Sequence, residues 1–166
     1  MQYNLKAPDR LQATVTLPAS KSISNRVSIL SALAPEAAPL INLADSDDGR
    51  ALQHALRSAD ETVDIGAAGT AMRFLTAYFA ARPGRTRLLT GSARMRQRPI
   101  GLLVDALRGL GADITYTERE GYPPLRIVGQ RLRGGEVTMD SGVSSQFLSA
   151  LLMVAPTMER GLQLRL

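Results

Sequence analysis

Three stretches of the chain place apolar or small residues at nearly every position of a helical repeat. They cover residues 22–33, 70–81 and 147–154. Apolar residues spaced three and four positions apart predict helices, and a helix that is apolar all round is predicted to be buried. Residues 45–58 and 100–110 instead separate an apolar from a polar face. They predict two amphipathic helices that cover the surface of the core.

Short runs of β-branched and apolar residues lie between these helices, and many are bounded by proline or glycine. Such runs predict strands. The predicted strands are residues 14–17, 40–43, 61–65, 86–90, 114–117, 125–128, 136–139 and 162–166. A repeat is visible in this order, because a strand leads into each buried helix, and between successive buried helices come an amphipathic helix and further strands. The order of elements predicts a mixed α/β fold.

Each predicted buried helix starts with small residues. The three starts are Ser20-Lys21-Ser22, Ala68-Gly69-Thr70 and Ser144-Ser145-Gln146. The first turn of a helix carries unpaired N–H groups and a partial positive charge, so it can bind an anion. An ordinary serine N-cap followed by a solvated basic turn would explain the first helix start taken by itself. The arrangement of small residues before an apolar helix recurs further along the chain, however, which favours a shared site. If the units pack alike, the helix N-termini meet at one anion site. The cations expected to line it are Lys21, Arg26, Arg73 and Arg98.

Charge and composition narrow the kind of partner. The net charge of +5 and an isoelectric point near 10.2 favour anions. Aromatic residues make up only 4% of the chain, so small phosphorylated molecules fit better than nucleic acid, which needs stacking side chains. The absence of cysteine fits a reducing compartment. No secretion signal and no apolar run near the roughly 20 residues of a membrane span are present, so we expect a cytoplasmic protein.

Four motifs give this chain a specific resemblance. They are Ser20-Lys21-Ser22-Ile23-Ser24-Asn25-Arg26, Ala68-Gly69-Thr70-Ala71-Met72-Arg73, Arg94-Met95-Arg96-Gln97-Arg98-Pro99-Ile100 and Ser144-Ser145-Gln146-Phe147. In this order they resemble the signature motifs of 5-enolpyruvylshikimate-3-phosphate synthase, an enolpyruvyl transferase. The resemblance runs from about Ser20 to the end of the chain.

The resemblance implies a fold and a division into domains. The family has two domains, each made of three β-α-β-α-β-β units with buried parallel helices whose N-termini converge on the anion site. Residues 19–166 would form an incomplete first domain, with two units, the first shortened, and the start of a third. Residues 1–18 would be a segment belonging to the second domain. The rest of that domain would follow in the C-terminal part of the enzyme.

The resemblance also implies an activity, which is transfer of enolpyruvyl from phosphoenolpyruvate to the 5-hydroxyl of shikimate 3-phosphate with release of phosphate. Residues 1–166 alone are expected to bind substrates without turning them over, since the acid–base groups would lie in the other domain. No cofactor, metal, nucleic acid or membrane is implied, and the partners are the two substrates.

Residue roles carried over by motif fall into two groups, with Lys21 and Arg98 also expected to be catalytic. The residues expected to hold phosphoenolpyruvate are Lys21, Gly69 and Arg98, with Gln146 near it. The residues expected to hold shikimate 3-phosphate are Ser22, Arg26, Ser144, Ser145 and Gln146. Thr70 is expected to bind substrate without being assigned to either. Arg73 ranks lower as a ligand, because the resemblance is also consistent with a structural role for this arginine. Lys21 should project into the cleft, because its nearest acids in sequence are Asp9 and Glu36.

Three departures from the family pattern affect the ligand geometry. Ala67 stands where the common motif has asparagine, and Phe74 stands where proline is frequent and could shift the helix start. The first unit also lacks the strands expected between Ser58 and Glu61.

Two other functions stay open. A sister enolpyruvyl transferase that acts on UDP-N-acetylglucosamine would share the fold, although the serine-rich motif speaks against it. A non-catalytic module that binds anions or nucleic acid would show a steep salt dependence.

Overall fold

The computed structural model describes residues 3–36, 38–140 and 142–166. Its helices are α1 (Lys21–Leu33), α2 (Asp47–Arg57), α3 (Gly69–Ala80), α4 (Ala93–Arg96), α5 (Gly101–Gly109), α6 (Ser145–Val154) and a 3-10 turn, η1 (Ala155–Thr157). Its strands are β1 (Thr62–Asp64), β2 (Thr86–Thr90), β3 (Asp113–Tyr116), β4 (Leu125–Val128), β5 (Gly135–Thr138) and β6 (Leu162–Arg165). The mixed α/β prediction is confirmed, and the predicted boundaries of these elements lie within about two residues of the observed ones.

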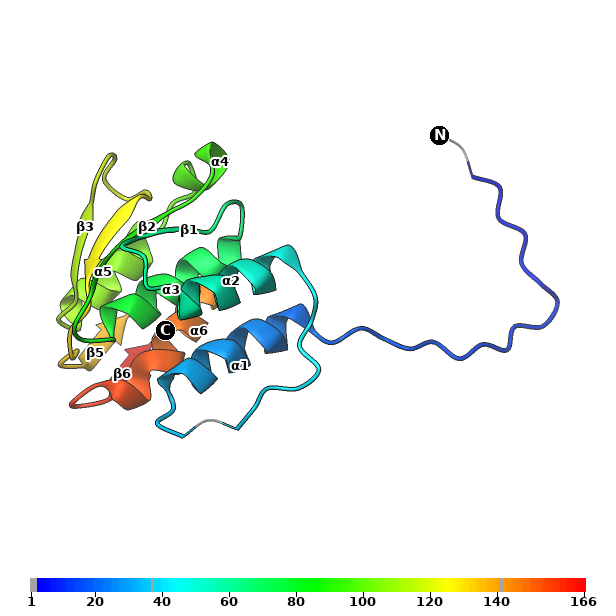
Figure 1. Cartoon of the computed structure of the whole chain (residues 1–166), viewed down its shortest axis with the longest axis horizontal. Helices are drawn as coiled ribbons and strands as arrows, with labels where there is room; N and C mark the ends of the chain where they lie inside the picture. Colours follow the sequence, from blue (N-terminus) through cyan, green and yellow to red (C-terminus); the bar gives the residue numbers. More distant parts are fainter. Residues whose placement is uncertain (1–2, 37, 141) are drawn as a thin grey trace.

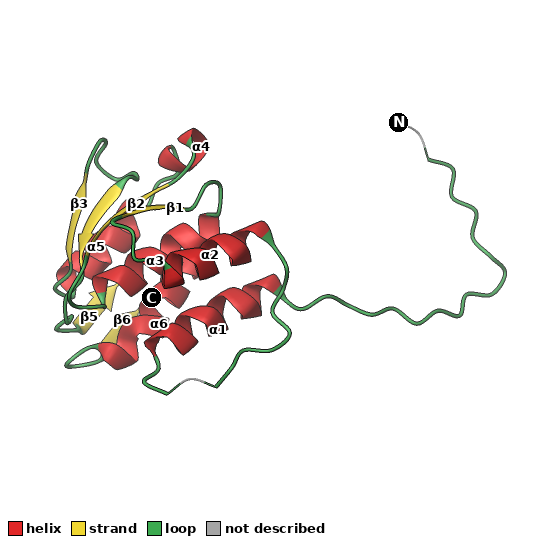
Figure 2. Cartoon of the chain, viewed as in Figure 1, coloured by secondary structure: helices red, strands yellow, loops and turns green. Residues whose placement is uncertain are grey.

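Two small sheets flank the helices (Figure 1). The first has the order β1-β2-β4-β3, in which β1 and β2 are parallel and the other two pairs are antiparallel. The second pairs β5 with β6 in parallel. Figure 2 shows most of the helical mass on one side of the four-stranded sheet. The parallel pairs require crossovers, which α3 and α6 supply after β1 and β5.

Helix α3 is the centre of the core. Every residue of α3 except Thr70 is buried, including Arg73. The helix contacts β2 and β4 on the sheet side and α1, α2, α5 and α6 on the others. A helix with neighbours on all sides needs an apolar surface all round. The sequence prediction of a buried helix at this position is therefore confirmed.

Helices α1 and α6 are less buried than their apolar sequences predict. Ile23 and Leu30 of α1 are 63% and 46% exposed, and Leu152 of α6 is 55% exposed. The prediction of all-round burial is wrong for these outer faces. Within the described residues, α6 packs mainly against α3, and α1 packs mainly against α2 and also against α3 and α6. No described element covers the side chains on their outer faces.

Two predicted strands are absent from the described residues. Residues 14–17 lie in an exposed segment that extends away from the folded body (Figure 1), and residues 40–43 form an irregular link. Asn42 in that link has a φ of 54°, which is outside the β region. A strand needs a partner for its backbone groups, and neither run has one among the described residues. Local apolar alternation was therefore a misleading signal.

The link between α2 and β1 is short. Ser46 caps α2 by accepting a hydrogen bond from the Gly49 backbone N–H at 3.2 Å, and Asp47 and Asp48 occupy its first turn, as the acidic cluster predicts. The helix ends at Arg57, and β1 begins at Thr62 with no strand between them. No strand lies between Ser58 and Glu61, as the sequence indicates.

Candidate functional site

The N-terminal turns of α1, α3 and α6 lie at the same end of the molecule. The Arg26 guanidinium of α1 donates to the Ser149 hydroxyl of α6 at 3.1 Å and lies 5.7 Å from the ring centroid of Phe74 in α3. All three residues are in the second turn of their helices. One turn earlier, the Gln146 side-chain amide of α6 donates to the Thr70 hydroxyl of α3 at 3.3 Å. The expected convergence of the three helix starts is confirmed.

The start of α1 is capped and paired. The Ser20 hydroxyl accepts a hydrogen bond from the Ile23 backbone N–H at 3.4 Å, and Ser22 is exposed at the first turn. The Lys21 ammonium lies 3.3 Å from the Asp48 carboxylate of α2. The expectation that Lys21 projects without a carboxylate partner is therefore wrong. An acid remote in sequence reaches it because α2 packs beside α1.

Two arginines meet at the start of α3. Arg73 is 5% exposed and donates to the Gly69 carbonyl at 2.9 Å. Burial, and then the charge of nearby Arg98, lower the pKa of Arg73 to about 10. Arg73 remains a cation at neutral pH, so it and Arg98 repel each other. A bound anion would reduce this repulsion. Arg73 is buried and bonded to the backbone, which is consistent with its lower rank among the candidate ligands.

Gly69 lets Arg98 cross the helix start. A Cβ built on Gly69 would overlap the Arg98 guanidinium and would lie 3.4 Å from that of Arg73. Only a residue without a side chain leaves this space to the arginine. The glycine expected at the ligand site is thus placed to admit the cation beside it.

Arg98 borders two cavities. One, of about 370 Å³, is lined by Ala67, Ser92, Arg94, Met95 and Arg98. The other, of about 440 Å³, is bordered by Arg73 and Arg98 on one side and by Ser144 and Gln146 on the other. None of the described residues that line either cavity carries a carboxylate. Both cavities around Arg98 are therefore positively charged and suited to anions. Lys21, Ser22 and Arg26 of α1 line neither cavity.

The start of α6 completes the second cavity. Ser144 is the N-cap, and its hydroxyl accepts a hydrogen bond from the Gln146 backbone N–H at 3.3 Å. Ser145 is the first residue of α6 and is exposed. A hydroxyl that accepts one hydrogen bond can still donate another. Both serines can therefore present O–H groups beside the unpaired N–H groups of the helix.

The sequence analysis did not predict several residues and contacts of this site. Arg94 and Ser92 line the first cavity, and Arg94 belongs to the same motif as Arg98, so its residue type was a usable signal. The short helix α4 that carries Arg94 was not predicted. Arg96 points elsewhere and pairs with Glu118 at 3.2 Å. Ser149 is 123 residues from Arg26, so no local pattern could reveal their hydrogen bond.

Two residues that depart from the family pattern, Ala67 and Phe74, have separate consequences for the site. Ala67 lines the first cavity, where no side-chain amide stands at this position. Phe74 is fully buried and supports the Arg26 guanidinium. Because α3 begins at Gly69, one residue earlier than predicted, Phe74 does not delay the helix start.

Replacing Gly69 by alanine should displace Arg98 with little effect on the fold. The new methyl group requires the flexible end of Arg98 to move, whereas alanine is the better helix former. We expect anion binding at the site to weaken several-fold while the melting temperature changes by less than about 3 °C. Titration calorimetry with phosphoenolpyruvate and thermal unfolding measure the two effects. Unchanged affinity would show that Arg98 does not bind the ligand.

These features define a mixed α/β protein with an anion site at converging helix N-termini. A sequence model described as EPSP synthase (3-phosphoshikimate 1-carboxyvinyltransferase) matches residues 5–61 and 53–166. The chain belongs to the EPSP synthase family. The two matched regions meet at residues 53–61, where the link between α2 and β1 is short.

Curated relatives carry the same name. The chain is 55% identical to a 3-phosphoshikimate 1-carboxyvinyltransferase of Bacteroides fragilis over 166 residues, which are 100% of this chain and 40% of the relative. It is 44% identical to one from Pseudoalteromonas translucida, with 93% of this chain and 42% of the relative covered. The chain thus spans about two fifths of the length of these relatives.

Solved structures agree with the fold. The EPSP synthase of Acinetobacter baumannii superposes with a TM-score of 0.78 and 25% identity, covering 87% of this chain and 38% of that one. No helix within the described residues is long and apolar enough to cross a membrane. The same residues contain no group of three or more His, Cys, Asp or Glu side chains that could hold a metal ion.

Proposed function

We propose that this chain forms the substrate-binding part of an enolpyruvyl transferase that joins phosphoenolpyruvate to shikimate 3-phosphate. The reaction forms an ether bond at the 5-hydroxyl of the shikimate ring and releases inorganic phosphate. Support comes from the family and from relatives named 3-phosphoshikimate 1-carboxyvinyltransferase. The observation that carries the proposal is the position of Arg98, which borders one cavity beside α4 and a second cavity at the start of α6.

We assign phosphoenolpyruvate to Lys21, Gly69 and Arg98. Its phosphate and carboxylate are both anionic, and guanidinium groups bind such groups through paired hydrogen bonds. Lys21 supplies a compact charge at the start of α1, and Asp48 holds its side chain in position. As the C–O bond to phosphate breaks, negative charge grows on the departing group, and fixed cations stabilise that charge. Lys21 and Arg98 are therefore the proposed catalytic residues.

We assign shikimate 3-phosphate to the start of α6 and to the facing turns of α1 and α3. Ser144 and Ser145 would donate to its phosphate, and Gln146 would lie between both substrates. Thr70 fixes the Gln146 amide at 3.3 Å. The remaining proposed ligands in α1 are Ser22 and Arg26. Arg26 also donates to the Ser22 carbonyl at 3.0 Å, so it couples the first two turns of α1 to the site.

We further propose that residues 1–18 belong to a second domain and residues 19–166 to the first. The segment 3–18 is exposed almost throughout, and large apolar side chains such as Leu5, Leu11 and Leu17 are 97%, 84% and 80% exposed. Residues 1 and 2 lie outside the described part. Such a segment gains stability by packing against another body.

Titration calorimetry of the 166-residue chain tests the function. We expect saturable binding of shikimate 3-phosphate and no binding of UDP-N-acetylglucosamine at the same concentration. Tight binding of the UDP-sugar instead would identify the sister transferase. Binding of RNA with a steep salt dependence, and of neither substrate, would identify a nucleic-acid-binding module.

A separate prediction concerns the release of inorganic phosphate when the chain is mixed with both substrates. Catalysis requires reacting groups to be held together, and the chain covers only about 40% of its relatives. We expect residues 1–166 to bind without releasing phosphate above a trace rate. Sustained phosphate release by the purified chain would contradict this assignment of the acid–base groups to the other domain.

A further inference from the structure

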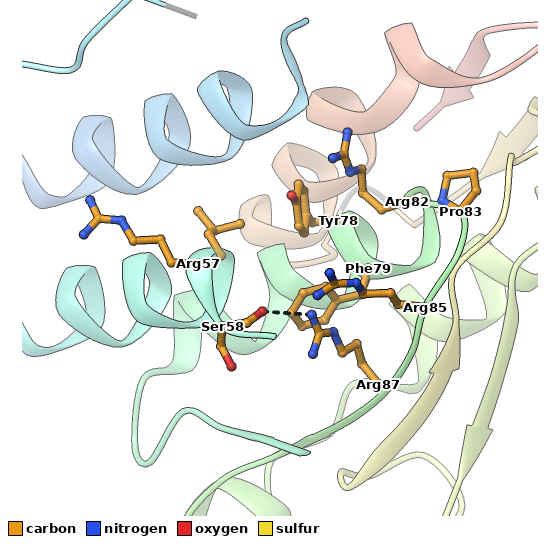
Figure 3. A pocket seen from close by; sticks show the side chains of 9 residues that line it. Arg57, Ser58, Tyr78, Phe79, Arg82, Pro83, Arg85 and Arg87 are labelled. Atoms are coloured by element: carbon orange, nitrogen blue, oxygen red, sulfur yellow. Dashed lines mark hydrogen bonds between the residues drawn. The ribbon is translucent and has the colours of Figure 1, made fainter. Parts of the chain in front are cut away.

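A second group of cations lies at the far end of α3 from the candidate site. A cavity of about 310 Å³ is lined there by Arg57, Arg82, Arg85 and Arg87 (Figure 3). We call it the arginine pocket. The five other lining residues within the described part of the chain are apolar, aromatic or serine, and none of them carries a carboxylate.

The arginine pocket is separate from the anion site at the helix starts. Gly69 begins α3, and Arg82 follows its last turn. With a rise of 1.5 Å per residue, the two residues lie on the order of 20 Å apart. The pocket is formed by the C-terminal ends of α2 and α3 and the beginning of β2. No residue of the four signature motifs lines it.

Strand geometry directs two of the arginines into the pocket. Side chains two residues apart in a strand share a face, and the Gly129 N–H donates to the Arg85 carbonyl at 2.9 Å, so the ladder extends to Arg85. Arg85 and Arg87 therefore share the face of β2 on which Leu89 is fully buried. Figure 3 shows both side chains extending toward Phe79. Arg87 is only 6% exposed on this face.

Known contacts leave the positive charge of the pocket uncompensated. Arg87 donates to the Ser58 carbonyl at 2.9 Å and lies 5.7 Å from the Phe79 ring centroid, and Arg82 lies 5.9 Å from that of Tyr78. Arg57 is in the last turn of α2, where a cation is favoured. Carbonyl groups, aromatic rings and helix ends offer partial negative charge only. Arg87 is the one buried arginine of the four, and a buried guanidinium without a full counter-charge is costly.

The nearby acids do not supply that charge. Asp60 is the closest carboxylate in sequence, and it accepts a hydrogen bond from the Ser58 hydroxyl at 2.7 Å. Among the described residues, no carboxylate forms an ion pair with any of the four arginines. An anion from outside the described chain would therefore complete the pocket.

We propose that the arginine pocket binds a small molecule through a diphosphate or triphosphate chain. Arg85 and Arg87 extend toward Phe79, whereas the side chains of Arg57 and Arg82 extend away from it (Figure 3). Four guanidinium groups spread along the pocket exceed the charge of one phosphate and match the three to four negative charges of an extended polyphosphate. The volume of about 310 Å³ lies at the lower end of the range for small-molecule sites. The aromatic rings of Tyr78 and Phe79 are 7% and 6% exposed. They support the arginines and offer little surface for a base, so the phosphate chain is the recognised group.

Calorimetry with sodium tripolyphosphate and with ATP tests this site in the 166-residue chain at about 0.15 M salt. We expect both to bind with a stoichiometry near one and with similar affinity. The double variant Arg82→Gln/Arg85→Gln removes two exposed pocket arginines and should weaken binding at least tenfold. The matched control Arg126→Gln/Arg160→Gln removes the same charge from exposed arginines outside the pocket and should change the affinity less than about threefold.

Four results would overturn the proposal. Equal weakening in the pocket and control variants would mean that only net charge matters. Unchanged binding in the pocket variant would place the polyphosphate elsewhere, and displacement by phosphoenolpyruvate would place it at the helix starts. Binding of ATP that survives loss of tripolyphosphate binding would show recognition of the base instead. Ser145→Ala should leave tripolyphosphate binding intact, so this test can succeed even where the assignment of the shikimate 3-phosphate site fails.

Discussion

Replacing Lys21 by methionine should reduce kcat/KM for enolpyruvyl transfer by about 100-fold or more. Loss of one preorganised electrostatic contact to a transition state costs on the order of 10²–10³ in rate. The measurement needs a complete enzyme, such as a chimera in which this chain replaces the matching region of the Bacteroides fragilis relative. In the 166-residue chain itself, the same change should weaken phosphoenolpyruvate binding at least tenfold.

Stability separates this role from a structural one. The Lys21 side chain is half exposed, so its ion pair with Asp48 is worth roughly 0–1 kcal/mol. We expect the melting temperature to fall by no more than about 4 °C. Arginine at position 21 should restore the charge but little of the activity, because its planar fork does not replace a compact ammonium.

Asp48→Asn is the matched control for Lys21→Met. It breaks the same ion pair and leaves the lysine charge in place, so most phosphoenolpyruvate binding should remain. A small loss of stability is expected as well, since Asp48 lies in the first turn of α2. If both variants lower the melting temperature equally and neither changes binding, Lys21 is a structural residue and its assignment to the substrate is wrong.

The double variant Ser144→Ala/Ser145→Ala should weaken shikimate 3-phosphate binding at least tenfold. Hydrogen bonds to a charged group contribute roughly 1.5–3 kcal/mol each, and 1.4 kcal/mol is a factor of ten. Titration calorimetry on the 166-residue chain measures the change. Ser144 is also the N-cap of α6, so its loss should destabilise the chain by about 1 kcal/mol.

Two single variants separate binding from capping. Ser145→Ala removes an exposed hydroxyl that caps nothing, and it should weaken binding several-fold at an unchanged melting temperature. Ser46→Ala removes the cap of α2 instead and should lower the melting temperature without changing shikimate 3-phosphate binding. Affinity that follows the melting temperature across all these variants would mean that the serines act only through stability.

The sequence alone was enough to predict every long helix and most of the strands, but not the short helix α4. Helix α3 is apolar all round and is buried all round, and Gly111 follows α5 with a φ of 103°, as a helix stop requires. Such features depend on residues within a few positions, because helical hydrogen bonds and caps are local. The candidate ligands at or just before a helix start were named from the family resemblance of local motifs, and they are Gly69, Arg98, Ser144 and Gln146.

Only the tertiary structure decided which groups meet. A strand depends on a partner, so the apolar runs at 14–17 and 40–43 failed to predict one. The Asp48 partner of Lys21, the Ser149 partner of Arg26 and the proximity of Arg73 to Arg98 all join elements distant in sequence. The same holds for the arginine pocket, whose cations come from α2, the end of α3 and β2. Coulombic and hydrogen-bond energies depend on distances of a few ångströms, and packing alone sets such distances between remote residues.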